Sequence, residues 1–189
     1  VEAGLDIPNY PQFRDINQMF LELIYGAEKV KGGYMQTDIL SMKKEKTPIP
    51  EAIAIRKSSQ KISEKIGAPF KIRICVVGPH ILSSFFIYRN KEIFSQLSSI
   101  ISQIVENSIF NEKHASVGIV SVEEPLFGLL DDSLVSYGSE GRETLLKAWE
   151  SIFSKAKAMG VQTTLHLHRT SDDLFWQIKS LDILEAPVD

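Results

Sequence analysis

The sequence predicts an α/β protein built as a parallel sheet or as a (β/α) barrel of the TIM-barrel type. Short segments rich in strand-forming residues alternate with amphipathic helical segments, which is the pattern of repeated β/α units. The predicted strands become almost continuously apolar, as parallel strands buried on both faces do. Polar residues follow the carboxyl ends of several strands, where the sites of such folds assemble.

The first part of the chain contains two predicted helices and few strand signals. Residues 5–7 are a short apolar start that breaks at the turn-forming cluster 8–11. Apolar residues recur at helical spacing from 14 to 29, which predicts a helix there. Residues 34–49 are expected to form an irregular or hairpin excursion, and a second helix is predicted over 52–66.

The rest of the chain alternates strands with helices. The strands are predicted from apolar, β-branched runs and the helices from apolar stripes with a period of 3.6 residues. We expect strands over 70–77, 117–122, 161–168 and 181–184, and helices over 93–109, 139–158 and 172–178. Residues 1–189 are expected to form a single domain, since this length is ordinary for one domain.

The strand predicted over 161–168 carries two histidines. Side chains alternate faces along a strand, so Thr164, His166 and His168 share one face while Leu165 and Leu167 share the other. This pattern indicates a face covered by helices and an opposite, polar face. For either histidine, the ordinary alternative is a polar residue with a structural role whose hydrogen bonds are satisfied. Two histidines on one face favour the interpretation that they belong to a functional site.

Four strand ends carry polar residues. They are Gly78-Pro79-His80, Glu123-Glu124-Pro125, His166-Leu167-His168 and Glu185-Ala186-Pro187. In barrels the carboxyl ends of the strands converge on the active site. The occurrence of polar residues at all four strand ends is therefore more informative than any one of these motifs. A solvated loop or a helix cap is the alternative for the glutamate pair, and a tight turn is the alternative for the glycine.

Composition excludes several classes of function. The net charge of -3 and the interspersed charges give no electrostatic footprint for nucleic acid. No apolar run approaches the roughly 20 residues that span a bilayer, so no membrane association is expected. The single cysteine, Cys75, excludes an intrachain disulfide framework and fits a reducing, cytoplasmic location. It also excludes a site within this chain that needs two thiolates.

The sequence resembles the cobalamin-independent methionine synthase family, in its carboxyl-terminal barrel. The runs that carry the resemblance are "GLDIPNYPQFRDINQMF", "VVGPHIL", "VSVEEPLFG", "TLHLHRTSDDLFWQI" and "LDILEAPVD", in that order. They are similar to the family's G-I-D segment, its G-P-x-T-I-L-like element, its I-D-E-P-A element, its H-x-H-x-C element and a later I-E element. The resemblance implies an incomplete barrel of about five β/α units, without the first strand and the last units.

The resemblance implies a zinc site. In the family zinc binds a homocysteine thiolate, which then accepts a methyl group from a folate. By position, His168 stands for the zinc histidine and Glu185 for the zinc glutamate, although Glu185 comes earlier than the family spacing. Thr170 stands where a cysteine ligand belongs, and the second cysteine would lie beyond Asp189. Because a hydroxyl is a poor zinc ligand, we expect weak zinc binding or none. The alternative is a His/carboxylate site, in which His166 and His168 bind a metal with Glu185 or Glu123.

The resemblance also implies substrate contacts. Glu123 replaces the aspartate that holds the substrate amino group, and Glu124 keeps the next position of that element. Both are therefore expected to be catalytic, with Glu123 also binding substrate. Gln12 lies near the family's acid or amide that contacts the amino acid, and Gly78 matches a substrate loop in which His80 disturbs the hydroxyl position.

The expected function is therefore a methyltransferase acting on a homocysteine-like thiol with a folate or related methyl donor. The first alternative is a related barrel enzyme, such as a corrinoid-linked methyltransferase or a uroporphyrinogen decarboxylase-like enzyme. A decarboxylase would need arginines for acidic side chains, and the candidates are Arg73, Arg89, Arg142 and Arg169. The second is a non-catalytic homologue that has lost its metal ligands. An incomplete barrel exposes sheet edges, which a homo-oligomer could cover.

Overall fold

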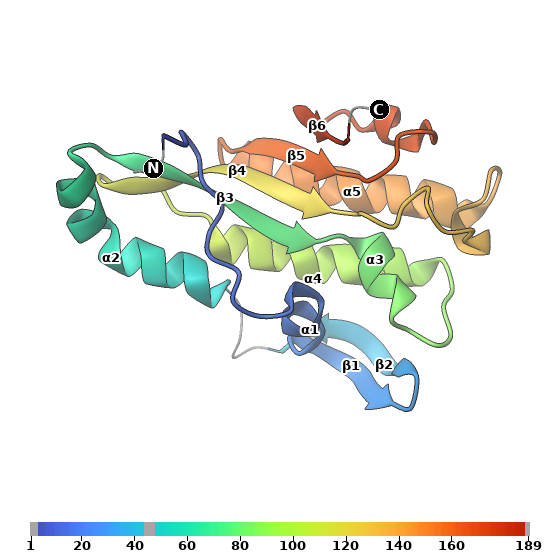
Figure 1. The fold of residues 1–189 in the computed structure, drawn as a ribbon. Coiled ribbons are helices and arrows are strands. Elements are labelled where there is room, and N and C mark those ends of the chain that lie inside the picture. Colours follow the sequence, from blue (N-terminus) through green and yellow to red (C-terminus); the bar gives the residue numbers. More distant parts are fainter. Residues whose placement is uncertain (1–3, 44–47, 188–189) are drawn as a thin grey trace.

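The computed structural model describes residues 4–43 and 48–187. Its centre is a four-stranded sheet in which all neighbouring strands are parallel and follow chain order (Figure 1). The strands are β3 (Phe70–Val77), β4 (Ala115–Glu123), β5 (Gln162–His166) and β6 (Ile183–Glu185). The chain is thus an α/β protein with a parallel sheet, as the apolar strand runs predict.

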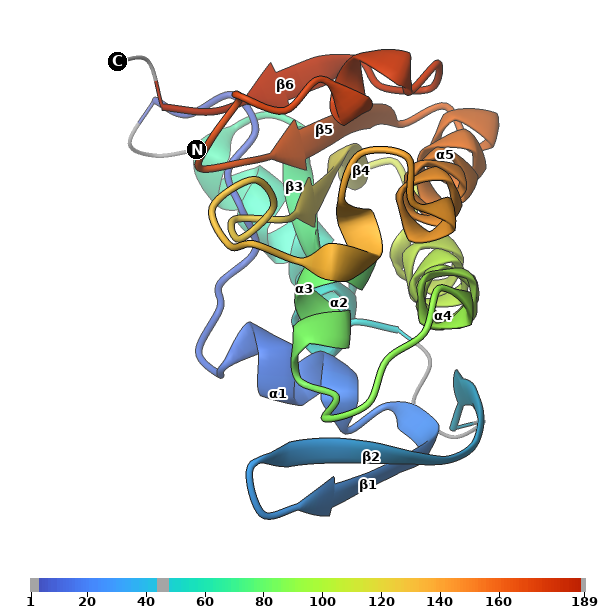
Figure 2. The same cartoon turned by 90° about the vertical axis from the view of Figure 1, so that its right-hand side faces the viewer.

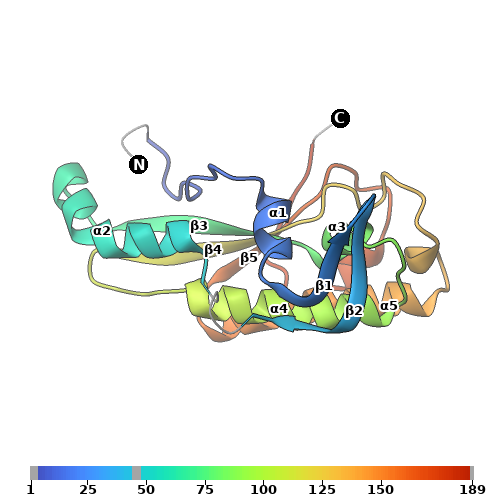
Figure 3. The ribbon, with the colours of Figure 1, turned by 90° about the horizontal axis from the view of Figure 1, so that it is seen from below.

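Two long helices cover one face of this sheet, α4 (Glu92–Ser108) and α5 (Glu140–Ala158) (Figure 3). The predicted apolar stripe of α4 is confirmed, since Ile93, Leu97 and Ile101 are at most 1% exposed. Trp149 and Phe153 of α5 are fully buried as well. Burying one such side chain contributes roughly 1.5–3 kcal/mol, so this layer holds much of the core.

The opposite face carries the amino-terminal segment and α1 (Ile16–Leu21) (Figure 3). Asn9 forms a parallel bridge with Arg73. The Arg73 amide donates to the Pro8 carbonyl at 2.9 Å, and the Tyr10 amide donates to the Arg73 carbonyl at 3.1 Å. The segment therefore extends the parallel arrangement past the β3 edge.

The predicted helix over 14–29 is wrong in its second half. After α1 the chain forms β1 (Ile24–Val30), which pairs antiparallel with β2 (Gly33–Met42). Gly26 has a φ of 81° at the point where the pairing register shifts, a conformation that glycine adopts without strain. Cross-strand pairing therefore overrides the helical spacing. The predicted hairpin excursion is confirmed as β2, and residues 44–47 lie outside the described residues.

The remaining elements agree with the prediction in kind and differ in extent. Helix α2 (Pro50–Ile66) begins at a proline, two residues before the predicted start at 52. The strand expected over 161–168 ends at His166, and a 3₁₀ turn, η2 (Leu174–Gln177), replaces the helix expected over 172–178. Short α3 (Pro79–Ser84) and the turn η1 (Ser133–Val135) were not predicted. No helix in the described part of the chain is long and apolar enough to cross a membrane.

Candidate functional site

The strand register places three polar side chains side by side. Glu123 pairs with Val77 on one side and with His166 on the other, and His166 pairs with Glu185. Figure 2 looks onto the carboxyl ends of the strands, where these residues lie. Since residues paired in register point to the same face, the structure brings Glu123, His166 and Glu185 together at the carboxyl end of the sheet.

These three side chains line a pocket of about 300 Å³ on the face away from α4 and α5. Gln12 lines the same pocket and comes from the segment that leads into α1. Arg73 also lines it, although it comes from near the middle of β3. The pocket is thus built from five chain segments and contains both carboxylates and a guanidinium.

Arg73 ties the carboxylates together. Its Nη2 lies 2.5 Å from Glu185 Oε2 and 3.4 Å from Glu123 Oε1, and it donates to Ser121 Oγ at 2.7 Å. The Ser121 hydroxyl in turn donates to Glu123 Oε1 at 2.7 Å. Burial disfavours the charged guanidinium, but its hydrogen bond to Glu185 and the surrounding negative groups raise the pKa of Arg73. Arg73 therefore acts as the positive centre of the pocket.

His166, rather than His168, faces the carboxylates. His166 Nδ1 lies 3.4 Å from Glu123 Oε2 and 3.7 Å from Glu185 Oε1, and both distances are longer than that of an ordinary hydrogen bond. His168 is exposed, outside the pocket lining, and its ring centroid lies 5.2 Å from that of His166. Of the predicted metal pair, the structure places only Glu185 in the pocket.

The pocket also contains the thiol of Cys75. Burial, with a smaller contribution from the charge of Glu123, raises the pKa of Cys75 to about 12. The thiol is therefore protonated near neutral pH and is a poor ligand or nucleophile. Beneath it, Tyr10 Oη donates to the Cys75 carbonyl at 3.1 Å and accepts from Gln12 Nε2 at 3.4 Å, so Gln12 is held at the pocket rim.

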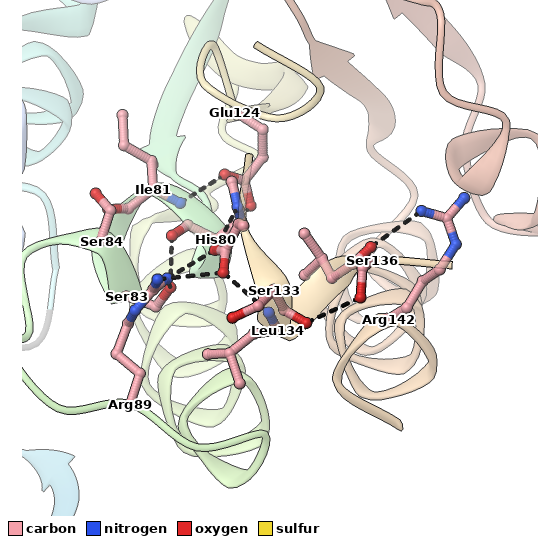
Figure 4. A network of polar contacts seen from close by, with 12 residues as sticks. His80, Ile81, Ser83, Ser84, Arg89, Glu124, Ser133, Leu134, Ser136 and Arg142 are labelled. Atoms are coloured by element: carbon pink, nitrogen blue, oxygen red, sulfur yellow. Dashed lines mark hydrogen bonds and ion pairs between the residues drawn. The ribbon is translucent and has the colours of Figure 1, made fainter. Parts of the chain in front are cut away.

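Glu124 has a different environment from Glu123. It is fully buried and accepts hydrogen bonds from the amides of His80 at 2.9 Å and Ile81 at 2.8 Å (Figure 4). Trp149 Nε1 donates to it at 2.9 Å. Burial raises the pKa of Glu124, although the charge of His80 and these donors oppose the rise. Glu124 does not line the pocket. It holds the first turn of α3 against α5 through these hydrogen bonds.

Gly78 serves the same arrangement. A Cβ atom at this position would lie 2.2 Å from the carboxyl carbon of Glu124, so no larger residue fits without moving that side chain. Gly78 is outside the pocket lining. The structure therefore gives the predicted substrate residue Gly78 a packing role, and its backbone amide donates to the Glu123 carbonyl at 2.9 Å.

A second polar network, which the sequence did not indicate, lies beside α3 (Figure 4). His80 Nε2 lies 3.1 Å from Asp132 Oδ2, and Arg89 binds the same carboxylate at 2.8 and 3.2 Å. Burial alone would raise the pKa of Asp132, but the hydrogen bonds from Arg89 and the Leu134 amide, together with the charge of Arg89, outweigh it and lower that pKa. The network fixes the loop after β4 to α3.

The arginines considered for a decarboxylase do not converge. Arg73 alone among them lines the pocket. Arg89 pairs with Asp132, Arg142 pairs with Asp172 at 2.6 Å, and Arg169 is exposed. A site for several acidic side chains is therefore not formed.

The donor set does not fit zinc held by thiolates. The described residues, 4–43 and 48–187, contain no group of three His, Cys, Asp or Glu side chains arranged to hold a metal ion. Zinc prefers nitrogen and sulfur donors, whereas Cys75 is protonated and Thr170 is exposed. In addition, the guanidinium of Arg73 already occupies the space beside both carboxylates.

No family model and no curated protein matches this chain. Among solved structures it is similar to a B12-independent methionine synthase from Shewanella sp. W3-18-1 in complex with selenomethionine, with 14% sequence identity and a TM-score of 0.55. The likeness is one of fold. It covers 93% of this chain and 50% of that chain, so this chain spans half the length of the solved one.

Proposed function

We propose that this protein is a methionine-synthase-like methyltransferase whose pocket binds an amino acid of the homocysteine or methionine type. The observation that carries the proposal is the convergence of Arg73, Glu123, His166 and Glu185 in one pocket at the carboxyl edge of a parallel sheet. The fold similarity to a B12-independent methionine synthase supports the theme of methyl transfer, from a folate or a related donor to a thiol.

The charges of the pocket suit a zwitterion. Glu123 and Glu185 can accept hydrogen bonds from a substrate ammonium group, while the Arg73 guanidinium can take a substrate carboxylate. Gln12, held at the rim by Tyr10, can add an amide contact. The pocket volume of about 300 Å³ is at the lower end of small-molecule sites, which favours a ligand of amino acid size.

A non-catalytic homologue that only binds the amino acid is the second candidate. Two observations favour it: Thr170 stands where a thiol ligand would be needed, and Arg73 pairs with both carboxylates of the pocket.

Calorimetric titration tests the binding proposal. We expect L-methionine to bind, and we expect its analogue without the amino group and its carboxamide each to bind about tenfold more weakly or worse, since each loses a charge-assisted hydrogen bond. Equal affinity for all three compounds would contradict a zwitterion site, and so would a lack of binding by all three. Formation of methionine from homocysteine and an N-methyl pterin, followed by mass spectrometry, then separates the enzyme from the binding protein.

A further inference from the structure

We propose that Arg73 is the resident cation of this pocket and that it excludes a metal ion from a latent site formed by Glu123, His166 and Glu185. The inference concerns the pocket of the proposed function, but it depends only on how the charges are arranged there. It holds whether or not an amino acid binds, because it predicts the metal affinity of the protein itself.

The two carboxylates need a positive partner. Glu123 and Glu185 lie on either side of His166 in adjacent strand positions, and their side chains are only 22% and 43% exposed. Like charges held this close repel one another unless a cation lies between them. Arg73 supplies it, since a single nitrogen, Nη2, contacts both carboxylates.

The same carboxylates also face the imidazole of His166. Nδ1 lies 3.4 Å from one and 3.7 Å from the other. Two carboxylate oxygens and an imidazole nitrogen are ordinary donors for Zn²⁺ and Co²⁺. In the described residues these donors are not arranged to hold a metal ion as they stand, and a divalent cation placed among these oxygens would also lie within a few ångströms of the permanent positive charge of Arg73.

Arg73 is well fixed in this position. Its side chain is 16% exposed, and its Nη2 donates to Ser121, whose hydroxyl donates to Glu123. The backbone N–H and C=O of Arg73 both hydrogen-bond to the amino-terminal segment, at Pro8 and Tyr10. The guanidinium therefore cannot leave the carboxylates at little cost, as the end of an exposed lysine could, and the exclusion is built into the fold.

The test is titration of the purified protein with Co²⁺ and Zn²⁺, followed by the visible absorption of Co²⁺ and by calorimetry. Arg73→Met and Arg73→Gln are both titrated, so that the test can still be made if one of the two variants does not fold. Circular dichroism shows which variants are folded. We expect each to bind about one equivalent of metal, at least roughly tenfold more tightly than the wild type, and we expect His166→Ala in the same background to remove the gain.

Two matched controls accompany these variants. Arg73→Lys keeps the charge and should show no gain, and Arg89→Met removes a partly buried arginine that pairs with Asp132 outside the pocket. Tight stoichiometric metal binding by the wild type, lost in His166→Ala, would overturn the proposal. So would a folded Arg73→Met or Arg73→Gln protein with unchanged metal affinity. Neither result depends on whether methionine binds, so the two proposals fail separately.

Discussion

Glu124→Ala is expected to lower the free energy of unfolding by at least about 3 kcal/mol. The substitution leaves three buried donors, the amides of His80 and Ile81 and the indole N–H of Trp149, without their acceptor. Each unsatisfied buried donor costs roughly 1–3 kcal/mol, and a cavity adds to the loss. Urea unfolding measured by circular dichroism checks the value.

The pH dependence of this effect has a definite sign. Burial raises the pKa of Glu124 above its usual value of 4.5. The folded state therefore favours the protonated side chain of Glu124. The stabilisation linked to this pKa shift is complete below about pH 4.5 and is lost as the pH rises through the raised pKa of the folded state. The non-titrating Glu124→Gln variant should thus lie closer to the wild type in stability at pH 7 than at pH 4.

Glu150→Gln provides a control for the Glu124 variants. It removes a carboxylate that also accepts hydrogen bonds from backbone amides, those of Lys179 and Ser180, but at a half-buried position. We expect a loss below about 1.5 kcal/mol there. A Glu124→Ala protein as stable as Glu150→Gln would show that Glu124 does not hold α3 against α5.

Glu123→Gln is expected to weaken the binding of L-methionine by about 10- to 100-fold. An amide keeps the shape of the side chain but removes the charge that would accept from the ligand ammonium, and a hydrogen bond to a charged group contributes roughly 1.5–3 kcal/mol. Calorimetry with the purified variant measures the change, and a thermal melt establishes that the protein is folded.

Glu112→Gln is the matched control, since Glu112 also pairs with an arginine, Arg56, but it precedes β4 and does not line the pocket. Its affinity for methionine should equal that of the wild type. If Glu123→Gln binds methionine as tightly as Glu112→Gln does, the ligand ammonium is not held by Glu123 and the proposed orientation is wrong.

The alternation of side chains explains how much of the site could be predicted. The faces of β5 follow from it: Leu165 and Leu167 are fully buried, and His166 faces the pocket. The same rule says that neighbouring glutamates cannot both face one site, which agrees with Glu123 in the pocket and Glu124 in the core. The alternation of side chains also places Arg73 on the same face of β3 as Cys75, so the position of Arg73 in the pocket could have been predicted from the sequence.

Other features depend on register and tertiary pairing. The choice between His166 and His168 is decided by where β5 ends, and a pattern of alternating residues does not fix an end. Register with Glu123 and Glu185 selects His166. Similarly, the helical spacing after Leu21 yields to the hairpin, because Tyr34 exchanges backbone hydrogen bonds with Phe85 and Ile87, contacts that no local pattern reveals.

The location of the site can be tested most directly by nuclear magnetic resonance. Uniformly ¹⁵N-labelled protein is titrated with L-methionine, and the amide shifts are followed. We expect the largest changes at the carboxyl ends of the parallel strands, at Val77, Glu123, His166 and Glu185. Changes centred on another part of the molecule, with these amides unmoved, would contradict the assignment of this pocket as the functional site.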